Sequence, residues 1–107
     1  MGKIQLDEDL IITKVIPLDG KRLKILLNTG SEIMLNMTNR LETARFASLQ
    51  NEEVFQSVTT DGYELHFSKG GNYALDFSLE EAIRMSISSP ESVYKHFLKE
   101  APASKIY

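Results

Sequence analysis

Three short segments of this chain have the composition and spacing of β-strands. The first, LIITKVIPL from Leu10, is rich in β-branched residues, and we expect it to end at Pro17. In RLKILLN from Arg22 and in residues 33–37, apolar side chains alternate with polar ones, so each strand has one apolar face. Turn residues that include Gly20 and Gly30 separate the segments. The pattern predicts a three-stranded antiparallel meander.

The same alternation returns in TTDGYELHFSKGGNYALDF, residues 59–77. Asp61-Gly62 and Gly70-Gly71 are turn sequences, so the segment predicts a β-hairpin. A phosphate-binding loop is disfavoured at SKGGNY because the lysine precedes the glycines and a strand follows. The aromatic residues could stack nucleobases, but alternate strand positions favour the core. We therefore expect a buried set of four rings: Tyr63, Phe67, Tyr73 and Phe77.

Capping patterns predict the first two helical regions. Asn39 stands three residues before Glu42 and precedes LETARFASL, which indicates a helix over residues 39–49, with a second short turn over residues 52–55. Ser78 stands three residues before Glu81, which indicates a helix from Leu79 to about residue 85. Both regions are expected to cover the apolar face of the sheet.

Ser89 followed by Pro90 predicts a last helix over residues 90–99, since proline is tolerated at the first helical position. The expected fold class is therefore α+β: an antiparallel β-meander and β-hairpin packed against short helices, with an extra C-terminal helix. We expect residues 1–107 to form a single domain, with residues 11–85 as its core. A sheet of this kind leaves an unpaired edge strand unless the last helix covers it.

Charge and composition disfavour several classes of function. Twelve basic side chains against fifteen acidic ones give a net charge of -3, which disfavours generic nucleic-acid binding. A local basic group at Lys95, His96 and Lys99 is typical of a solvated helix face. The absence of cysteine excludes disulfides and thiolate chemistry. The apolar runs are too short to cross a membrane and the first residues lack a signal-peptide stretch, so we expect a cytoplasmic protein.

Histidine is the candidate catalytic residue by type, because imidazole titrates near neutral pH. His66 is expected at an outward strand position beside Glu64, and two ligands are too few for a metal site without partners elsewhere. His96 is expected on the solvated face of the last helix. The acidic pairs at 52–53 and 80–81 indicate charges at helix starts. The sequence therefore predicts no catalytic, cofactor-binding or metal residue, and no cofactor.

The order of elements and turns resembles the small bacterial family called domain of unknown function 2442. The resemblance covers about Ile12 to Ile83 and is carried by VIPLDGKRLKILLNTGSEIMLNM, by Leu49 and Phe55, and by YELHFSKGGNYALDF. The tryptophan common in the family is replaced by Phe67, and the segment from Pro90 lies beyond the usual core. The resemblance implies a compact α+β fold without established activity. Some relatives are joined to helix-turn-helix domains and others are encoded beside small partner proteins.

We therefore expect a non-catalytic protein-interaction or regulatory module, as in a toxin–antitoxin-like or transcriptional pair. Its partner is expected to be another protein or a second copy of the chain, without a membrane. A nucleic-acid-binding accessory protein is the alternative. An unrecognised enzyme is the third hypothesis, and it requires a cleft that gathers His66 or His96 with carboxylates from remote segments.

Overall fold

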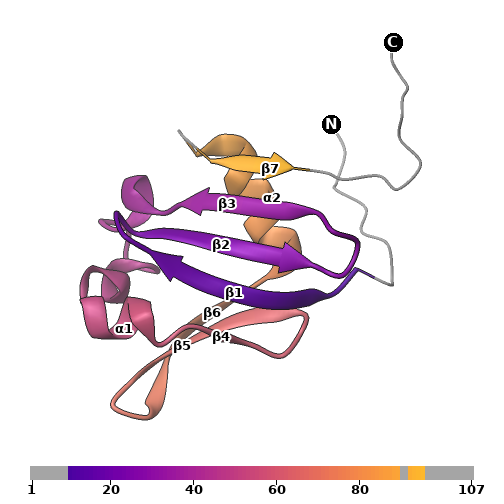
Figure 1. Cartoon of the computed structure of the whole chain (residues 1–107). Helices are drawn as coiled ribbons and strands as arrows, with labels where there is room; N and C mark the ends of the chain where they lie inside the picture. Colours follow the sequence, from indigo (N-terminus) through magenta and orange to yellow (C-terminus); the bar gives the residue numbers. More distant parts are fainter. Residues whose placement is uncertain (1–9, 90–91, 96–107) are drawn as a thin grey trace.

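Three strands that follow one another along the chain form an antiparallel meander (Figure 1). The computed structural model describes residues 10–89 and 92–95. Leu23 lies opposite Leu35, and Ile25 lies opposite Ile33, so the predicted apolar faces meet on one side. The meander is confirmed. With one further strand it forms a four-stranded sheet in the order β1 (Ile12–Leu18), β2 (Arg22–Leu27), β3 (Glu32–Asn36) and β7 (Val93–Lys95).

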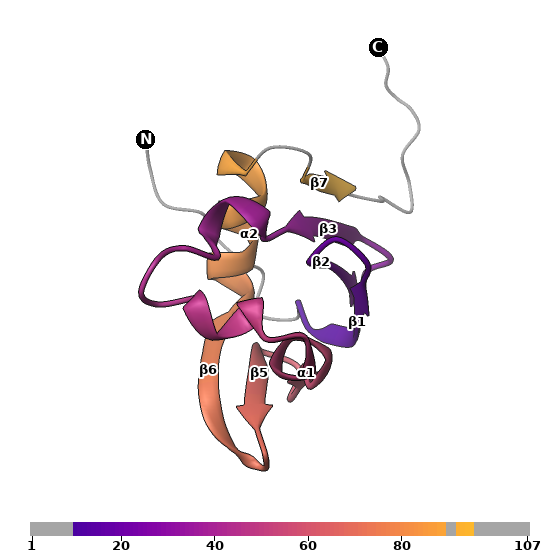
Figure 2. The same cartoon turned by 90° about the vertical axis from the view of Figure 1, so that its left-hand side faces the viewer.

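A second, three-stranded antiparallel sheet contains the predicted hairpin, which extends away from the first sheet (Figure 2). Gly70 and Gly71 have φ values of 58° and 87°, and such positive values at both central residues suit a two-residue hairpin turn. This geometry explains the two glycines without a phosphate-binding role. The sheet has the order β4 (Thr59–Thr60), β5 (Glu64–Lys69) and β6 (Asn72–Ser78).

The two sheets meet where β1 begins. The N–H of Ile12 donates a hydrogen bond to the carbonyl of Gly62, with an N–O distance of 2.8 Å. Gly62 has a φ of 103°, and a Cβ atom there would lie 3.2 Å from Cγ2 of Ile11. Both the backbone angle and the close approach therefore favour glycine at this junction.

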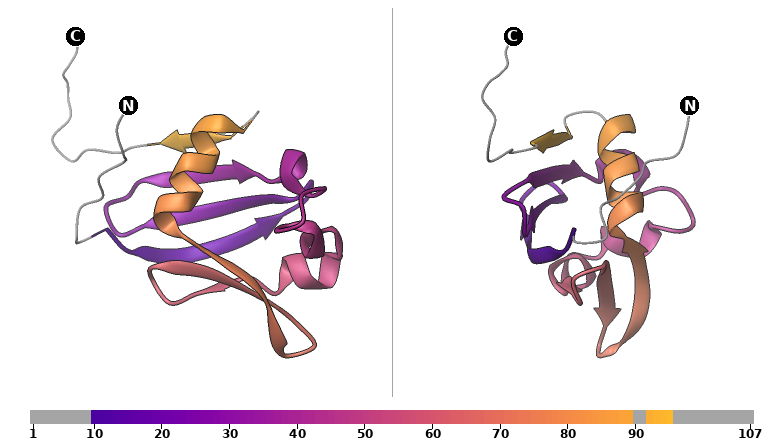
Figure 3. Two further views of the ribbon diagram at one scale, coloured as in Figure 1. Left: turned by 180° about the vertical axis from the view of Figure 1, so that it is seen from behind. Right: turned by 90° about the vertical axis from the view of Figure 1, so that its right-hand side faces the viewer.

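Two α-helices of the described residues begin at polar caps. The sequence predicts the cap of the second helix. Asn51 Oδ1 accepts a hydrogen bond from the Glu53 N–H at the start of α1 (Glu52–Gln56). Ser78 Oγ accepts one from the Glu81 N–H at the start of α2 (Leu79–Ser88). The predicted helix from Leu79 is confirmed and continues to Ser88. It crosses one face of the four-stranded sheet, which we call the inner face (Figure 3).

The core lies between the inner face, α1, α2 and the hairpin, and its described residues form one cluster. Phe67 stacks on both Phe55 and Phe77, with ring centroids 6.5 and 5.9 Å apart. Phe46 meets Phe77 edge to face. Offset stacking and edge contacts are the favourable arrangements for aromatic rings. This aromatic group joins the hairpin to the helices.

The predicted helix over residues 39–49 is wrong. The segment forms two short 3-10 turns, η1 (Thr38–Arg40) and η2 (Ala47–Gln50), and no side chain caps the first of them. Instead, Asn36 Oδ1 accepts hydrogen bonds from the backbone N–H and the hydroxyl of Thr38. This local bond fixes a turn directly after β3, in competition with a helical cap at Asn39.

The predicted helix over residues 90–99 is wrong at residues 93–95, which form β7 and pair with β3. Ser89 has extended backbone angles, as expected for a residue before proline. The Asn36 N–H donates to Ser92 Oγ at 2.8 Å, and the edge of β3 offers backbone partners beyond it. Strand pairing therefore outweighs the capping signal. Ser92 is not helical either, and residues 90–91 and 96–99 lie outside the described part of the chain.

The expectation that four hairpin aromatics are buried is half right. Phe67 and Phe77 are each 2% exposed, whereas Tyr63 is 60% and Tyr73 is 74% exposed. The register of the hairpin shifts between Phe67 and Ser68, and Tyr73 lies opposite the outward-facing Ser68. The shift therefore places Leu75 and Phe77 on the buried face, whereas Tyr73, on the turn side of the shift, stays on the outward face.

Candidate functional site

The outer face of the β5–β6 hairpin brings a histidine close to three carboxylates. His66 lies directly opposite Asp76, with 3.6 Å between His66 Nδ1 and Asp76 Oδ2. Directly opposite residues of an antiparallel pair point to the same face of the sheet. Glu64 lies two residues before His66 and therefore shares this face. With Asp61 from the preceding turn, these residues form what we call the hairpin-face cluster: Asp61, Glu64, His66 and Asp76.

Asp61 is held in place by the backbone. Its Oδ1 accepts hydrogen bonds from the N–H groups of Tyr63 and Glu64, both at 2.9 Å, and its Oδ2 lies 3.4 Å from His66 Nε2. The two backbone hydrogen bonds, and then the contact with His66, lower the pKa of Asp61 to about 2, because each favours the charged form. Asp61 is therefore ionised at neutral pH. Its carboxylate is the neighbour of His66 Nε2 and favours one orientation of the imidazole ring.

The other three members of the cluster converge. One oxygen of Glu64, one nitrogen of His66 and one oxygen of Asp76 all lie within 4.8 Å of one another, and all three residues are partly exposed. Imidazole nitrogen and carboxylate oxygen are both ligands for divalent transition metals. The cluster thus has the donor types and the convergence needed to hold a cation.

Glu64 and His66 stand out in the sequence, but their spacing there indicates no further ligand. The structure adds Asp76 from the neighbouring strand and Asp61 from the turn. The interpretation of His66 as a solvated surface residue is therefore incomplete, because its ring is 39% exposed and lies between two carboxylates. His96 lies outside the described residues.

Three of the four carboxylates in the acidic pairs at the helix starts form ion pairs. Glu80 binds Arg84 at 2.6 Å on the same helix, and Glu81 binds Arg45. Glu52 binds Lys21 at 2.7 Å, and this contact, followed by a hydrogen bond from Gln56, lowers the pKa of Glu52. These carboxylates lie in the first turns of α1 and α2, as predicted.

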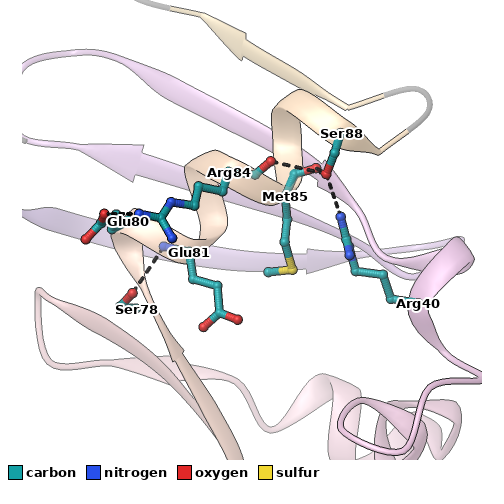
Figure 4. Close-up of a pocket in the computed structure, with 7 residues that line it drawn as sticks. All are labelled: Arg40, Ser78, Glu80, Glu81, Arg84, Met85 and Ser88. Carbon is teal, nitrogen blue, oxygen red and sulfur yellow. Dashed lines mark hydrogen bonds and ion pairs between the residues drawn. The ribbon is translucent and has the colours of Figure 1, made fainter. Parts of the chain in front are cut away.

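An open pocket of about 410 Å³ lies along α2 (Figure 4). Arg84 is paired with Glu80, and Arg40 Nη2 donates a hydrogen bond to Ser88 Oγ at 2.8 Å. The charged groups in this pocket already bind one another or neighbouring residues, so they give it little selectivity for a charged ligand. Its lining consists of Arg40, Ser78, Glu80, Glu81, Arg84, Met85 and Ser88.

The face of the four-stranded sheet opposite α2 is a second candidate site, which we call the outer sheet face. In Figure 1 this face is toward the viewer, and no described helix covers it. Ile16, Lys24 and Met34 form a row across β1, β2 and β3, and each is only half-buried. The outward positions of the three strands are otherwise occupied by Lys14, Leu18, Arg22, Leu26, Glu32 and Asn36.

Apolar and basic side chains are mixed on the outer sheet face. Half-buried Ile16, Leu18, Leu26 and Met34 lie among three cations and one carboxylate, namely Lys14, Arg22, Lys24 and Glu32. Among the described residues, no ion pair involves any of these four charged groups. The face therefore offers both apolar area and an excess of positive charge.

No helix within residues 10–89 and 92–95 has the length and apolar character needed to cross a membrane. Compared with protein-family models, curated proteins and solved structures, the chain gives no significant match to any of them. The resemblance to domain of unknown function 2442 therefore stays a prediction.

Proposed function

We propose that this protein is a non-catalytic interaction module that binds a partner protein through its outer sheet face. The observation that supports this proposal is the row of Ile16, Lys24 and Met34, where apolar side chains flank a cation on a face that no other described element covers. Apolar side chains that stay partly exposed beside polar ones are typical of interaction surfaces.

The composition of the face distinguishes it from an ordinary solvated sheet. An antiparallel sheet commonly has one face in water, and the residues on that face are then mainly polar. Here apolar and polar residues are interspersed, and Ile16 and Met34 flank the same central lysine. A partner that covered these side chains would remove apolar surface from water, which is favourable by about 25 cal/mol per Å².

The charges favour an acidic partner. Three cations and one carboxylate lie on the outer sheet face of a chain whose overall charge is -3. Charge complementarity between partners steers association and suppresses wrong partners. The inner face of the same sheet already packs against α2, an amphipathic helix with Glu80 and Glu81 in its first turn. We therefore propose an acidic amphipathic helix as the partner element.

Two other occupants fit the face less well. A second copy of the chain, bound face to face, would place Lys14, Arg22 and Lys24 against the same cations. A nucleic acid would find cations, but the outward positions of β1, β2 and β3 carry no aromatic ring on which a base could stack. A role in a regulatory pair, of the toxin–antitoxin-like or transcriptional kind, follows from the family resemblance and is consistent with a module that binds one partner helix.

An NMR titration of the full chain locates the binding face. The probe is a helical peptide of about 18 residues with leucine on one face and glutamate on the other, long enough to form a helix in water. We expect the largest amide shifts at Ile16, Lys24 and Met34. Shifts confined to α1 or α2, or no shifts, would contradict the proposal.

Two control titrations separate the alternatives. The same peptide with lysine in place of glutamate should leave the amides of β1, β2 and β3 unchanged, because it repels the cations. A DNA duplex that shifted these amides at low salt, when the acidic peptide did not, would replace the protein partner with a nucleic acid. Self-association of the unliganded chain through these strands would replace it with a second copy.

A further inference from the structure

We infer that the outer face of the β5–β6 hairpin binds a divalent transition-metal ion between Glu64, His66 and Asp76. This site lies on the other sheet from the outer sheet face, so the inference does not depend on the proposed interaction function. It rests on three ligand atoms that converge from two paired strands and on a fourth residue that orients the histidine.

The ligand set favours a particular class of metal. Imidazole is a good ligand for zinc, copper, iron and nickel, whereas magnesium and calcium prefer oxygen ligands alone. Two carboxylates and one imidazole leave at least one coordination position for water, as in open zinc sites with three protein ligands. We therefore assign the site to zinc or a similar divalent transition metal, with Mg²⁺ and Ca²⁺ as weak competitors.

The two ring nitrogens of His66 have different neighbours. Nδ1 lies on the side of Asp76, at 3.6 Å from Oδ2, and Nε2 lies on the side of Asp61, at 3.4 Å from Oδ2. Histidines that ligate a metal usually donate their second N–H to a carboxylate or carbonyl, which fixes the tautomer. In this arrangement Nδ1 binds the metal and the Nε2 N–H donates to Asp61.

Backbone hydrogen bonds and strand pairing hold three residues of the hairpin-face cluster in place. Asp61 accepts two backbone hydrogen bonds in its own turn, so its carboxylate is in place before any metal arrives. His66 and Asp76 are directly opposite residues of the β5–β6 strand pair, which restricts their separation. The three ligand atoms already lie within 4.8 Å of one another, so a bound ion has to draw them together by only a short distance.

An ion pair without metal is the competing explanation of the same geometry. A protonated His66 between Asp76 and Asp61 would also satisfy these contacts, and it would give Glu64 no special role. The two explanations therefore differ at Glu64. Metal binding requires the Glu64 carboxylate, whereas the ion pair does not.

Calorimetric titration of the full chain with ZnCl₂ in metal-free buffer tests the inference. We expect one zinc ion per chain, with MgCl₂ and CaCl₂ giving much weaker heats. His66→Gln should abolish binding, and Glu64→Gln should weaken it at least about tenfold. Asp61→Asn should weaken it about 10- to 100-fold, as is usual for a carboxylate that orients a ligand.

The second histidine of the chain provides the matched control. His96→Gln removes the same side chain elsewhere and should leave zinc affinity unchanged. Glu64 and His66 are partly exposed and Asp61 is exposed, so each variant is expected to fold, and circular dichroism checks this. The absence of zinc binding to the wild type would overturn the inference. Binding that survived His66→Gln, that was unchanged in Glu64→Gln, or that was lost in His96→Gln would overturn it equally.

Discussion

Arg40 and Ser89, which are 49 residues apart in the chain, are joined by two hydrogen bonds from the guanidinium group to Ser89 Oγ, at 3.0 Å from Nη2 and 3.3 Å from Nε. Arg40 ends η1, and Ser89 directly follows α2. Ser89 is buried, so these bonds satisfy a hydroxyl with little access to water. The contact ties the end of α2 to the segment that follows β3.

Arg40→Ala should therefore lower the free energy of unfolding by about 1–2 kcal/mol, because it leaves a buried hydroxyl without its donor. Arg84→Ala is the matched control. Arg84 is largely exposed and pairs with Glu80 one turn earlier on α2, so its loss should cost less than about 0.5 kcal/mol. Urea unfolding of both variants gives the comparison. Equal losses would mean that the Arg40 bonds do not hold α2 in place.

The stacked rings of the core give a second prediction. Phe67→Ala removes the ring that contacts both Phe55 and Phe77, and it should lower the free energy of unfolding by about 3–5 kcal/mol. Tyr73→Ala changes an aromatic residue of the same hairpin that is exposed, so its effect should stay within about 0.5 kcal/mol. Thermal or chemical unfolding distinguishes the two. A large loss in Tyr73→Ala would contradict the outward position of that ring.

The lowered pKa of Asp61 predicts a pH dependence of stability. Its value of about 2 lies below the ordinary 3.8, so ionised Asp61 stabilises the fold above the ordinary value. This contribution is lost as the pH falls from about 4 toward 2. Asp61→Asn keeps an acceptor oxygen for the turn but removes the charge. The wild type should therefore be more stable than this variant near neutral pH, and the difference should shrink as the pH falls through that range.

Asp61→Ala separates the turn from the charge in the same experiment. It removes the acceptor for the Tyr63 and Glu64 N–H groups as well as the charge, so it should be less stable than Asp61→Asn at every pH. A difference between the wild type and Asp61→Asn that did not change with pH would contradict the assigned pKa.

The meander could be predicted from the sequence because two features specify the same register: the positions of the turns and the alternation of apolar side chains. The turns bring Leu23 opposite Leu35, and a shift by one residue would turn the apolar side chains of a strand toward water. The same argument places Ile25 against Ile33. Local pattern and burial agree there, so the prediction is reliable.

The hairpin-face cluster was missed because it depends on an irregularity in the hairpin. With a two-residue turn at Gly70-Gly71 and a regular ladder, His66 would lie opposite Leu75. The register shift instead places Leu75 opposite Phe67 and Asp76 opposite His66. The sequence contains a signal for this shift. Leu75 is apolar, and only the shifted register places it on the same buried face as Phe67. Tyr73 lies between the turn and the shift, opposite Ser68, so it does not share the buried face of Leu75 and Phe77.

The wrong helix predictions share one physical cause. Capping signals act locally and succeed where nothing competes with them, as at Ser78. Beside Asn39, the side chain of Asn36 holds a turn instead. After Ser89, the open edge of β3 offers backbone partners that a sequence pattern does not reveal. The first competitor is a local side-chain bond, and the second is a tertiary contact that local spacing does not predict.

Charge-reversal variants show whether the outer sheet face binds the acidic amphipathic peptide. By calorimetry, Lys24→Glu should weaken binding about tenfold or more, since it reverses the charge at the centre of the outer sheet face. Lys69→Glu makes the same charge change at the far end of β5, away from that face, and should bind like the wild type. Wild-type affinity in Lys24→Glu, or an equal loss in Lys69→Glu, would contradict the account.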